Sequence, residues 1–261
     1  MPKVSVIIGI YNCANTLQEA MDSLFAQTFQ DFEIILCEDG SKDNTYDVAK
    51  SISQTHSNVK LLHNKQNMGL NISLNNCLAV ADGKYIARMD GDDISLPTRF
   101  EKEVHFLDTH PEYAIVTTPM IHFDEDGDFR YGHGGREPVL TDFAKHSPFC
   151  HAPCMVRKEA YDAVGGYSVG DWLLRQEDYH LWIKMVKKGF RGYTLEEPLY
   201  KMRDDRNAFR RRNWLSRRNE AYVKYLACKE LHLPFYYYLY CFKPIILYLM
   251  PSFLYQKLHR I

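Results

Sequence analysis

The sequence predicts an α/β fold built on an open parallel sheet, and three observations support this prediction. Apolar runs rich in β-branched residues begin almost at the first residue and alternate with segments of helical periodicity. Unusual polar residues follow several of these runs directly, where ligands bind in such sheets. With 261 residues, 46% hydrophobic and 25% charged, the chain is ordinary for a globular protein and long enough to bury a sizeable core.

The first element is residues 4–12, whose apolar, β-branched composition is typical of a buried parallel strand. A helix is expected from Thr16, with Asn15 placed to cap it and apolar residues following at helical spacing. The remaining elements follow in turn: strands at 32–37, 59–62 and 83–89, and helices at 45–55 and 71–81. Strand and helix alternating from the N-terminus is the pattern of an open parallel sheet.

Three carboxylates, Asp90, Asp92 and Asp93, come directly after the strand at 83–89. Mg²⁺ and Mn²⁺ prefer oxygen ligands, and in transferases they typically take one or two carboxylates plus substrate phosphates. An acidic cluster is more often a solvated turn, but other polar residues stand at the ends of the earlier strands: Tyr11, Asn12 and Asp39. Because ligands bind at the carboxyl ends of parallel strands, the sequence indicates a nucleotide-diphosphate site there.

Five short motifs occur in a fixed order over about residues 3–205. They are Val-Ile-Ile-x-x-Tyr-Asn at 6–12, Glu-Asp-Gly-Ser-x-Asp at 38–43, Asn-x-Gly-Leu at 67–70, Asp-Gly-Asp-Asp at 90–93, and Gly-Gly-Tyr at 165–167 followed by Glu177-Asp178. In this ordered set the chain resembles the family 2 glycosyltransferases of bacterial surface-polysaccharide synthesis. The resemblance implies the GT-A fold, an open mixed sheet flanked by helices that binds a nucleotide sugar.

The resemblance also implies a role for each matching residue on the donor side. Asp39 would accept a hydrogen bond from the nucleobase, and Asp90 would contact the ribose or sugar of the donor. Asp92 would be the direct ligand of a Mn²⁺ or Mg²⁺ ion. The full set of donor-binding residues implied is Ile10, Tyr11, Asn12, Asp39, Asn67, Gly69, Asp90 and Gly91.

On the acceptor side the resemblance makes Asp178 the general base and lets Glu177 orient the acceptor or the base. Such chemistry needs these residue types, because departure of a nucleoside diphosphate builds charge that a metal neutralises, and an acceptor hydroxyl needs a positioned base. The alternative is that Glu177 and Asp178 only favour a helix N-terminus electrostatically. Trp172 and His151 are further acceptor-site candidates, although His151 could equally be a core histidine.

The C-terminal part differs in charge from the rest of the chain. From residue 201 onward it has 13 Lys or Arg against 4 Asp or Glu, so this part carries +9 and the remainder −10. Residues 231–261 are rich in tyrosine, which suits the lipid headgroup boundary, and their uncharged runs are too short to span a bilayer. We therefore expect a helix pair lying on an anionic membrane, with no nucleic-acid partner, while a packed helix or a homodimer interface remains the alternative.

The domain organisation expected is a catalytic domain at 1–202 and a basic, Tyr-rich helical tail at 203–261 that associates with the membrane. Within the catalytic domain, residues 1–93 would form the nucleotide-sugar-binding half and 94–202 the acceptor-binding half. Seven scattered cysteines and the absence of a secretory leader favour a reducing cytoplasm, with the protein peripheral on the inner face of the cell membrane.

Two other patterns suggest metal sites and are rejected. Cys150 and Cys154 have no second pair at metal-ligand spacing, which argues against structural zinc. The acidic run 124–128 is flanked by short apolar segments with Asp-Gly at its centre, so it is expected to be a hairpin turn rather than a calcium loop.

The function expected is an inverting hexosyl- or N-acetylhexosaminyl-type glycosyltransferase. It would move a sugar from a nucleotide-diphosphate donor, a UDP-sugar by expectation, to a hydroxyl of a lipid-linked glycan. The alternative is a catalytically inactive nucleotide-sugar-binding or scaffold protein of the same fold. A Rossmann dehydrogenase is not expected, because the Gly-x-Gly-x-x-Gly turn is missing after the first strand.

Overall fold

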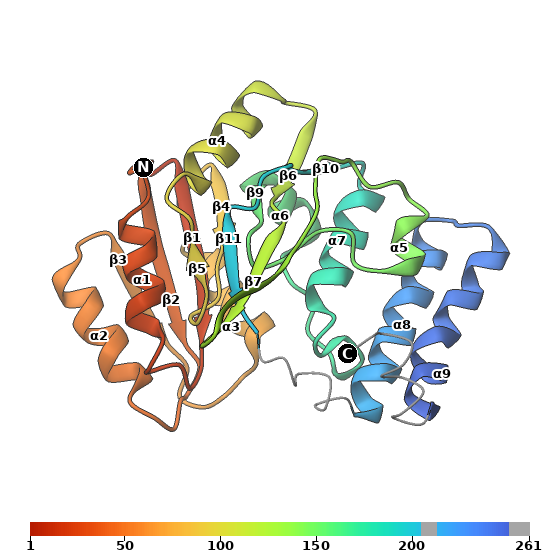
Figure 1. The fold of residues 1–261 in the computed structure, drawn as a ribbon, viewed down its shortest axis with the longest axis horizontal. Coiled ribbons are helices and arrows are strands. Elements are labelled where there is room, and N and C mark those ends of the chain that lie inside the picture. Colours follow the sequence, from red (N-terminus) through yellow and green to blue (C-terminus); the bar gives the residue numbers. More distant parts are fainter. Residues whose placement is uncertain (205–212, 251–261) are drawn as a thin grey trace.

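The computed structural model describes residues 1–204 and 213–250 and has a mixed α/β architecture (Figure 1). A seven-stranded sheet has the order β10-β6-β9-β4-β1-β2-β3, and a four-stranded sheet has the order β5-β11-β7-β8. The parts of the expected membrane tail at 205–212 and 251–261 lie outside the described residues.

The main sheet is mixed, as the family resemblance implied. β1 pairs in parallel with β2 and β4, whereas β9 pairs antiparallel with both β4 and β6. The alternation of strands and helices alone predicts only the parallel part. The strands of this sheet are β1 (Val4–Ile10), β2 (Phe32–Glu38), β3 (Val59–His63), β4 (Tyr85–Arg88), β6 (Tyr113–Thr117), β9 (Met155–Arg157) and β10 (Arg191–Thr194).

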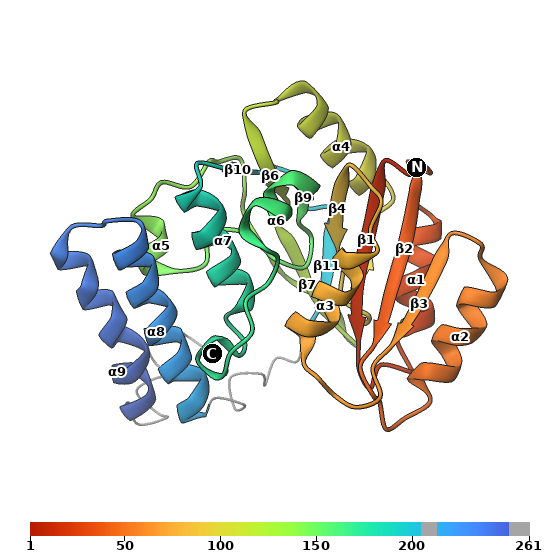
Figure 2. The same cartoon turned by 180° about the vertical axis from the view of Figure 1, so that it is seen from behind.

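Helices cover both faces of the main sheet (Figures 1 and 2). The helices in the described ranges are α1 (Leu17–Phe25), α2 (Thr45–Thr55), α3 (Leu70–Ala79), α4 (Arg99–Thr109), α5 (Asp142–Lys145), α6 (Lys158–Val164), α7 (Glu177–Lys187), α8 (Trp214–Glu230) and α9 (Lys243–Leu249), with the 3₁₀ helices η1 (Asp171–Leu173) and η3 (Phe235–Phe242). The expected cap at Asn15 is wrong: the N-cap is Thr16, which makes no side-chain cap hydrogen bond. The backbone amide of Leu17 instead donates to the Cys13 carbonyl at 2.9 Å.

The alternation of side chains along β1 divides the core in two. Val6 and Ile8 are fully buried in a cluster with apolar side chains of α1, α2 and α4. Ile7, between them in sequence, is buried in a second cluster with side chains of α3, α6, α7 and α8. The apolar run that predicted a buried strand is therefore covered by helices on both sides.

The second sheet brings distant segments to the end of β4. Its strands are β5 (Ile94–Ser95), β7 (Met120–Asp124), β8 (Gly127–Tyr131) and β11 (Tyr200–Arg203). β7 and β8 form an antiparallel hairpin that turns at 124–127, which confirms the hairpin expected for the acidic run. β11 lies parallel to β7 and ends at Arg203, one residue beyond the expected domain boundary, which stays a prediction.

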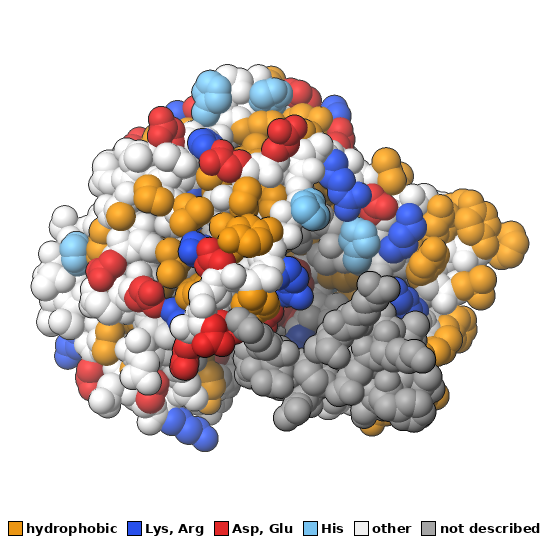
Figure 3. All heavy atoms as spheres, viewed as in Figure 1, with side chains coloured by type: hydrophobic (Ala, Val, Ile, Leu, Met, Phe, Trp, Pro, Cys, Tyr) orange, Lys and Arg blue, Asp and Glu red, His pale blue; other side chains and the backbone are white. Residues whose placement is uncertain are grey.

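The C-terminal helices form a layer beside α7 (Figure 2). α8 packs against α5, α7 and η1, and it buries Asn219, Val223 and Ala227. η3 and α9 lie outside α8 and leave large apolar side chains exposed, including Phe235, Leu239, Phe242, Ile246 and Leu249. Figure 3 shows hydrophobic side chains gathered at this edge of the molecule. None of the helices in the described ranges is long and apolar enough to cross a membrane.

Candidate active site

A cleft of about 400 Å³ lies at the carboxyl ends of β1 and β4. It is lined by the end of β1, the loop into α1, the turn after β4 and the end of β11. The residues lining it are Gly9, Ile10, Tyr11, Asn12, Cys13, Ala14, Asn15, Thr16, Asp43, Asp90, Gly91, Asp92 and Arg203. Six residues expected at the donor and metal sites therefore line one cleft: Ile10, Tyr11, Asn12, Asp90, Gly91 and Asp92.

Close backbone approach shapes the floor of this cleft. A Cβ atom on Gly91 would lie 2.9 Å from a methyl carbon of Ile10, so only glycine lets the turn after β4 pack against the end of β1. The Thr16 hydroxyl donates to the Gly91 carbonyl at 3.1 Å and ties this turn to the start of α1. Asn12 has a positive φ of 50°, and its side-chain oxygen accepts from the Lys42 amide at 2.8 Å.

Asp39 holds the segment that carries two other expected donor-site residues. Its carboxylate accepts from the Met68 and Gly69 backbone amides, both at 2.9 Å, and from the side-chain amide of Asn64 at 2.8 Å. An ionised carboxylate has about four acceptor positions, so three are used inside the protein and one is left. The role expected for Asp39 toward a nucleobase and the donor-binding roles of Asn67 and Gly69 stay predictions, and none of the three residues lines the cleft.

A buried guanidinium pairs with one of the carboxylates that line the cleft. Arg88, the last residue of β4, is 4% exposed and holds both oxygens of Asp90 in a bidentate pair. Burial is the largest single effect and lowers the pKa of Arg88, but Asp90, Tyr200 and Tyr167 together outweigh it and the pKa is raised. Asp90 is thereby fixed by Arg88 on its carboxylate and by the Tyr200 hydroxyl, which accepts from its backbone amide at 3.1 Å.

Asp92 and Asp93 behave differently although they are neighbours. Burial, followed by the negative charge of Asp90, raises the pKa of the Asp92 carboxyl. The same two causes, in the same order, raise the pKa of Asp93 to about 8. Asp93 is 2% exposed and accepts from the Arg203 backbone amide at 2.8 Å. A carboxyl of that pKa holds a proton near neutral pH, and Asp93 does not line the cleft, whereas Asp92 does.

Arg88 and Arg203 are the site residues that sequence reasoning missed. Arg203 donates from Nε to the Asp92 carbonyl at 3.0 Å and pairs with Glu19 of α1, so its guanidinium borders the cleft. In the sequence it counted only as part of the basic tail. A signal for Arg88 did exist, because a charged residue within an apolar strand requires a buried partner.

Glu177 and Asp178 form the first turn of α7, as expected from the sequence. Burial is the largest cause that raises the pKa of each carboxyl, while the charge of Arg88 acts on both in the opposite sense. The charge of Asp90 further raises the pKa of Asp178. The turn after β4 and the N-terminus of α7 thus share one electrostatic environment around Arg88.

The Gly-Gly-Tyr motif has a steric reason. Gly166 has a φ of +67°, and a Cβ atom there would lie 2.6 Å from the Asn75 side-chain oxygen of α3. Because Gly166 has no Cβ atom, the Asn75 side chain can accept from the Tyr167 amide and donate to the Tyr167 carbonyl, both at 2.8 Å. Asn71 donates to the Ser168 carbonyl at 3.1 Å. Two amides of α3 therefore anchor the loop that leads to Glu177 and Asp178.

Of the other acceptor candidates, His151 contacts this loop and Trp172 is part of it. His151 bonds through Nε2 to the Tyr167 hydroxyl at 2.8 Å and contacts the Trp182 ring. Burial, then the charge of Arg88, lowers its pKa well below the usual value, so its imidazole is neutral. Trp172 is 49% exposed on η1 and does not line the cleft. Their roles toward an acceptor stay predictions.

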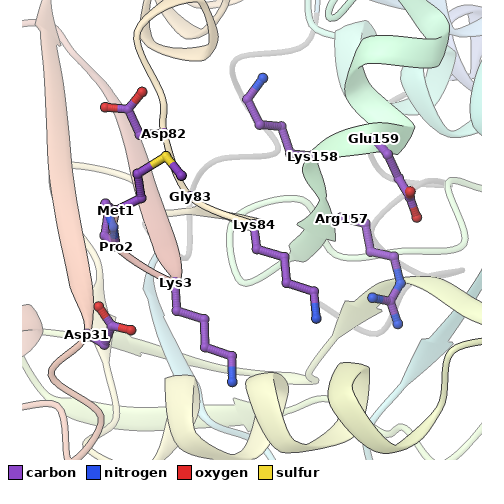
Figure 4. A pocket seen from close by; sticks show the side chains of 10 residues that line it. All are labelled: Met1, Pro2, Lys3, Asp31, Asp82, Gly83, Lys84, Arg157, Lys158 and Glu159. Carbon is purple, nitrogen blue, oxygen red and sulfur yellow. The ribbon is translucent and has the colours of Figure 1, made fainter.

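A larger cavity, of about 720 Å³, lies at the opposite, amino-terminal end of β1 and β4. Figure 4 shows its Lys3, Lys84 and Arg157 side chains directed the same way. Lys3 and Lys84 pair with Asp108 of α4, and Arg157 donates to backbone carbonyls at the end of that helix. These cations hold α4 against the sheet, so we assign no chemistry to this cavity.

The cleft offers a divalent metal one protein ligand, the Asp92 carboxylate. The described residues contain no group of three or more His, Cys, Asp or Glu side chains able to hold an ion. Asp90 is occupied by Arg88, whereas no cation among the described residues pairs with the Asp92 carboxylate. One carboxylate plus substrate phosphate oxygens is an ordinary ligand set for Mg²⁺. A cation would also relieve the repulsion between Asp92 and Asp90.

Comparison with known proteins decides the family. The model of the family "Glycosyl transferase family 2" matches residues 5–165. The chain belongs to glycosyltransferase family 2. It is 44% identical to a putative glycosyltransferase, EpsE, of Bacillus subtilis over 99% of this chain and 94% of that protein. It is 28% identical to WfaP of Escherichia coli, named as a UDP-Glc:α-D-GlcNAc-diphosphoundecaprenol β-1,3-glucosyltransferase, over 74% and 73% of the two chains.

A solved structure supports the fold. The mannosyltransferase PcManGT of Pyrobaculum calidifontis, in complex with GDP-Man and Mn²⁺, matches 94% of this chain and 74% of its own with a TM-score of 0.67 and 18% identity. The GT-A fold implied by the motifs is thereby confirmed, and the family 2 chain is a glycosyltransferase of mixed α/β architecture.

Asp39→Ala tests the organisation of the donor side. Because the substitution leaves two backbone amides and one side-chain amide without their acceptor, we expect a loss of about 1–3 kcal/mol in the free energy of unfolding. UDP binding should weaken as well, measured by calorimetric titration beside urea denaturation. Gln54→Ala, at an exposed position near the end of α2, is the control and should change neither quantity. Unchanged stability and unchanged UDP affinity in Asp39→Ala would contradict this assignment.

Proposed function

We propose that this protein is a metal-dependent, inverting glycosyltransferase that transfers a hexosyl or N-acetylhexosaminyl group from a UDP-sugar to a hydroxyl of a lipid-linked glycan. The product would belong to a surface polysaccharide or glycolipid made at the cytoplasmic leaflet. One observation carries the proposal: the charge of the same buried cation, Arg88, acts on the carboxyls of both Asp92 and Asp178.

The donor side of this proposal rests on the cleft at the ends of β1 and β4. Ile10, Tyr11 and Asn12 would form the wall beside the nucleobase, and Asp90 would meet the ribose or sugar. A Mn²⁺ or Mg²⁺ ion held by Asp92 and the diphosphate would neutralise the charge of the leaving group. Arg203, whose guanidinium borders the cleft, would add positive charge beside the same phosphates.

The acceptor side rests on the N-terminus of α7. Asp178 would take the proton of the attacking hydroxyl, and Glu177 would orient the acceptor or the base. A single displacement with one base inverts the anomeric centre, so an α-linked donor would yield a β-linked product. WfaP, by its name, transfers glucose from a UDP donor in a β-1,3 linkage to a diphosphoundecaprenol-linked sugar, which supports this class of donor and acceptor.

A donor screen combined with Asp92→Ala tests the donor chemistry. The protein is incubated with each nucleotide sugar and Mn²⁺, and released nucleoside diphosphate is measured. We expect release from a UDP-sugar that stops with EDTA and with Asp92→Ala, while circular dichroism shows the fold intact. Activity that survives both treatments would contradict the metal-dependent mechanism. Release from no donor at all would favour the inactive nucleotide-sugar-binding or scaffold protein.

Asp178→Asn tests the base. The amide keeps the shape of the side chain and removes its basicity, so donor affinity should stay near the wild-type value while transfer falls about 10²-fold or more. Because burial raises the pKa of Asp178, the base is protonated at a higher pH than an ordinary aspartate, and wild-type activity should fall as the pH drops through that raised pKa. Loss of UDP affinity in Asp178→Asn would instead assign the residue to the donor site.

We further propose that the C-terminal layer binds the anionic inner face of the membrane. The +9 charge from residue 201 onward and the exposed side chains of η3 and α9 support this location. Leu239 and Phe242 are 69% and 60% exposed, so replacing both by Asp should abolish flotation with anionic vesicles without changing stability.

Tyr131→Asp, an exposed aromatic position on β8, is the control and should float like the wild type. A wild-type protein that does not float, combined with an oligomeric state that changes in the Leu239→Asp, Phe242→Asp variant, would make this layer a homodimer surface.

A further inference from the structure

The loop between α6 and α7 is attached to the C-terminal layer by one buried side chain. Asn219 of α8 is fully buried, and its amide donates to the carbonyls of Asp171 at 2.9 Å and Leu174 at 3.2 Å. Its side-chain oxygen accepts from Arg218, from Nε at 3.1 Å and from Nη2 at 2.9 Å. Both ends of the Asn219 side chain are thus used, and they join the loop to Arg218.

Arg218 is held in this position without a carboxylate partner. Its guanidinium lies 3.8 Å from the centre of the Trp172 ring, and Trp172 in turn contacts the Tyr222 ring at 5.4 Å. Nη2 also reaches the Asp171 carbonyl at 3.4 Å. Among the described residues no acid pairs with Arg218, whereas its neighbour Arg217 pairs with Glu220. The positive charge of Arg218 is therefore fixed in direction but not neutralised.

We propose that Arg218 and Trp172 form an acceptor subsite that binds the phosphate group linking an acceptor sugar to its lipid. This inference rests on the proposed function and names a part of its acceptor site. A planar guanidinium is suited to phosphate, and stacking on an indole preorganises it for that contact. The half-exposed Trp172 supplies an apolar surface beside the charge for a sugar ring or the first part of a lipid chain.

The position in the chain assigns this subsite to the acceptor. The loop that carries Trp172 runs directly into Glu177 and Asp178, and neither Trp172 nor Arg218 lines the donor cleft. Figure 2 shows α8 beside α7, the helix that begins with the proposed base. Asn219 is then a positioning residue, because it fixes the loop and the guanidinium together.

The test is binding of geranyl diphosphate by the full chain, measured by calorimetry with saturating UDP and Mn²⁺ so that the donor cleft is filled. Arg218→Gln should weaken binding about tenfold or more, in line with hydrogen bonds to charged groups. Arg218→Lys keeps the charge but loses the planar guanidinium, so its affinity for geranyl diphosphate should lie between those of the wild type and Arg218→Gln. Trp172→Ala should also weaken binding, and neutral geraniol should bind no tighter to the wild type than to Arg218→Gln.

Arg217→Gln, one residue earlier and paired within its own helix, is the matched control and should bind geranyl diphosphate like the wild type. Wild-type affinity in Arg218→Gln would overturn the proposal. The proposal would also be overturned if Arg218→Gln bound geranyl diphosphate like the wild type but floated less with anionic vesicles. Arg218 would then contact lipid headgroups. If no nucleotide sugar is hydrolysed but the probe binds through Arg218, the proposed transfer fails and the subsite stands.

Discussion

A guanidinium removed from water must be matched by a carboxylate and by hydrogen-bond acceptors, and Arg88 imposes this requirement at the centre of the site. Its guanidinium donates to both oxygens of Asp90 on the proposed donor side. Its charge lowers the pKa of the Glu177 and Asp178 carboxyls, which burial raises. The carbonyl of Arg88 is held in turn by the side chain of Arg99, which pairs with Glu103 in full burial. The end of β4 is therefore fixed from two directions, and the turn at 90–93 can take few other positions relative to α7.

The two halves of the site are held by different forces. On the proposed donor side the register of parallel strands places the ends of β1, β2 and β4 next to each other, and backbone hydrogen bonds set the spacing. On the acceptor side the loop before α7 has no strand register. Neutral side-chain amides hold it, those of Asn71 and Asn75 on α3 and that of Asn219 on α8, and the cations Lys184 and Arg218 donate to its Gly166 and Asp171 carbonyls. Amide contacts are insensitive to salt, so this loop should keep its position at an anionic surface where ion pairs weaken.

Local sequence signals predicted the first half of the fold to within one or two residues, as in the strand observed at Phe32–Glu38 and the helix at Thr45–Thr55. The residues that the motifs assigned to the donor and metal sites include Tyr11, Asn12 and 90–92, and these line one cleft. What the sequence did not reveal depends on contacts between distant segments. The antiparallel insertion of β9 has no short-range pattern, and nothing near Arg203 indicates that β11 returns to the end of β4. Asn15 is a residue type that often caps helices, but it lies one residue before the observed N-cap of α1, Thr16.

The two acidic clusters show why composition alone does not define such a site. The run at 124–128 contains more carboxylates than the turn at 90–93, yet it forms an exposed hairpin in which Asp128 pairs with Lys201 at 2.9 Å. Solvent and a lysine compensate these charges, so they have no need of a bound cation. At 90–93 the carboxylates follow a strand that is buried on both faces, where Asp90 is matched by Arg88 and the pKa of Asp92 is raised by burial. Carboxylates that burial destabilises gain most from a divalent ion and a diphosphate, and the end of the central strand β4 creates that condition beside the cleft.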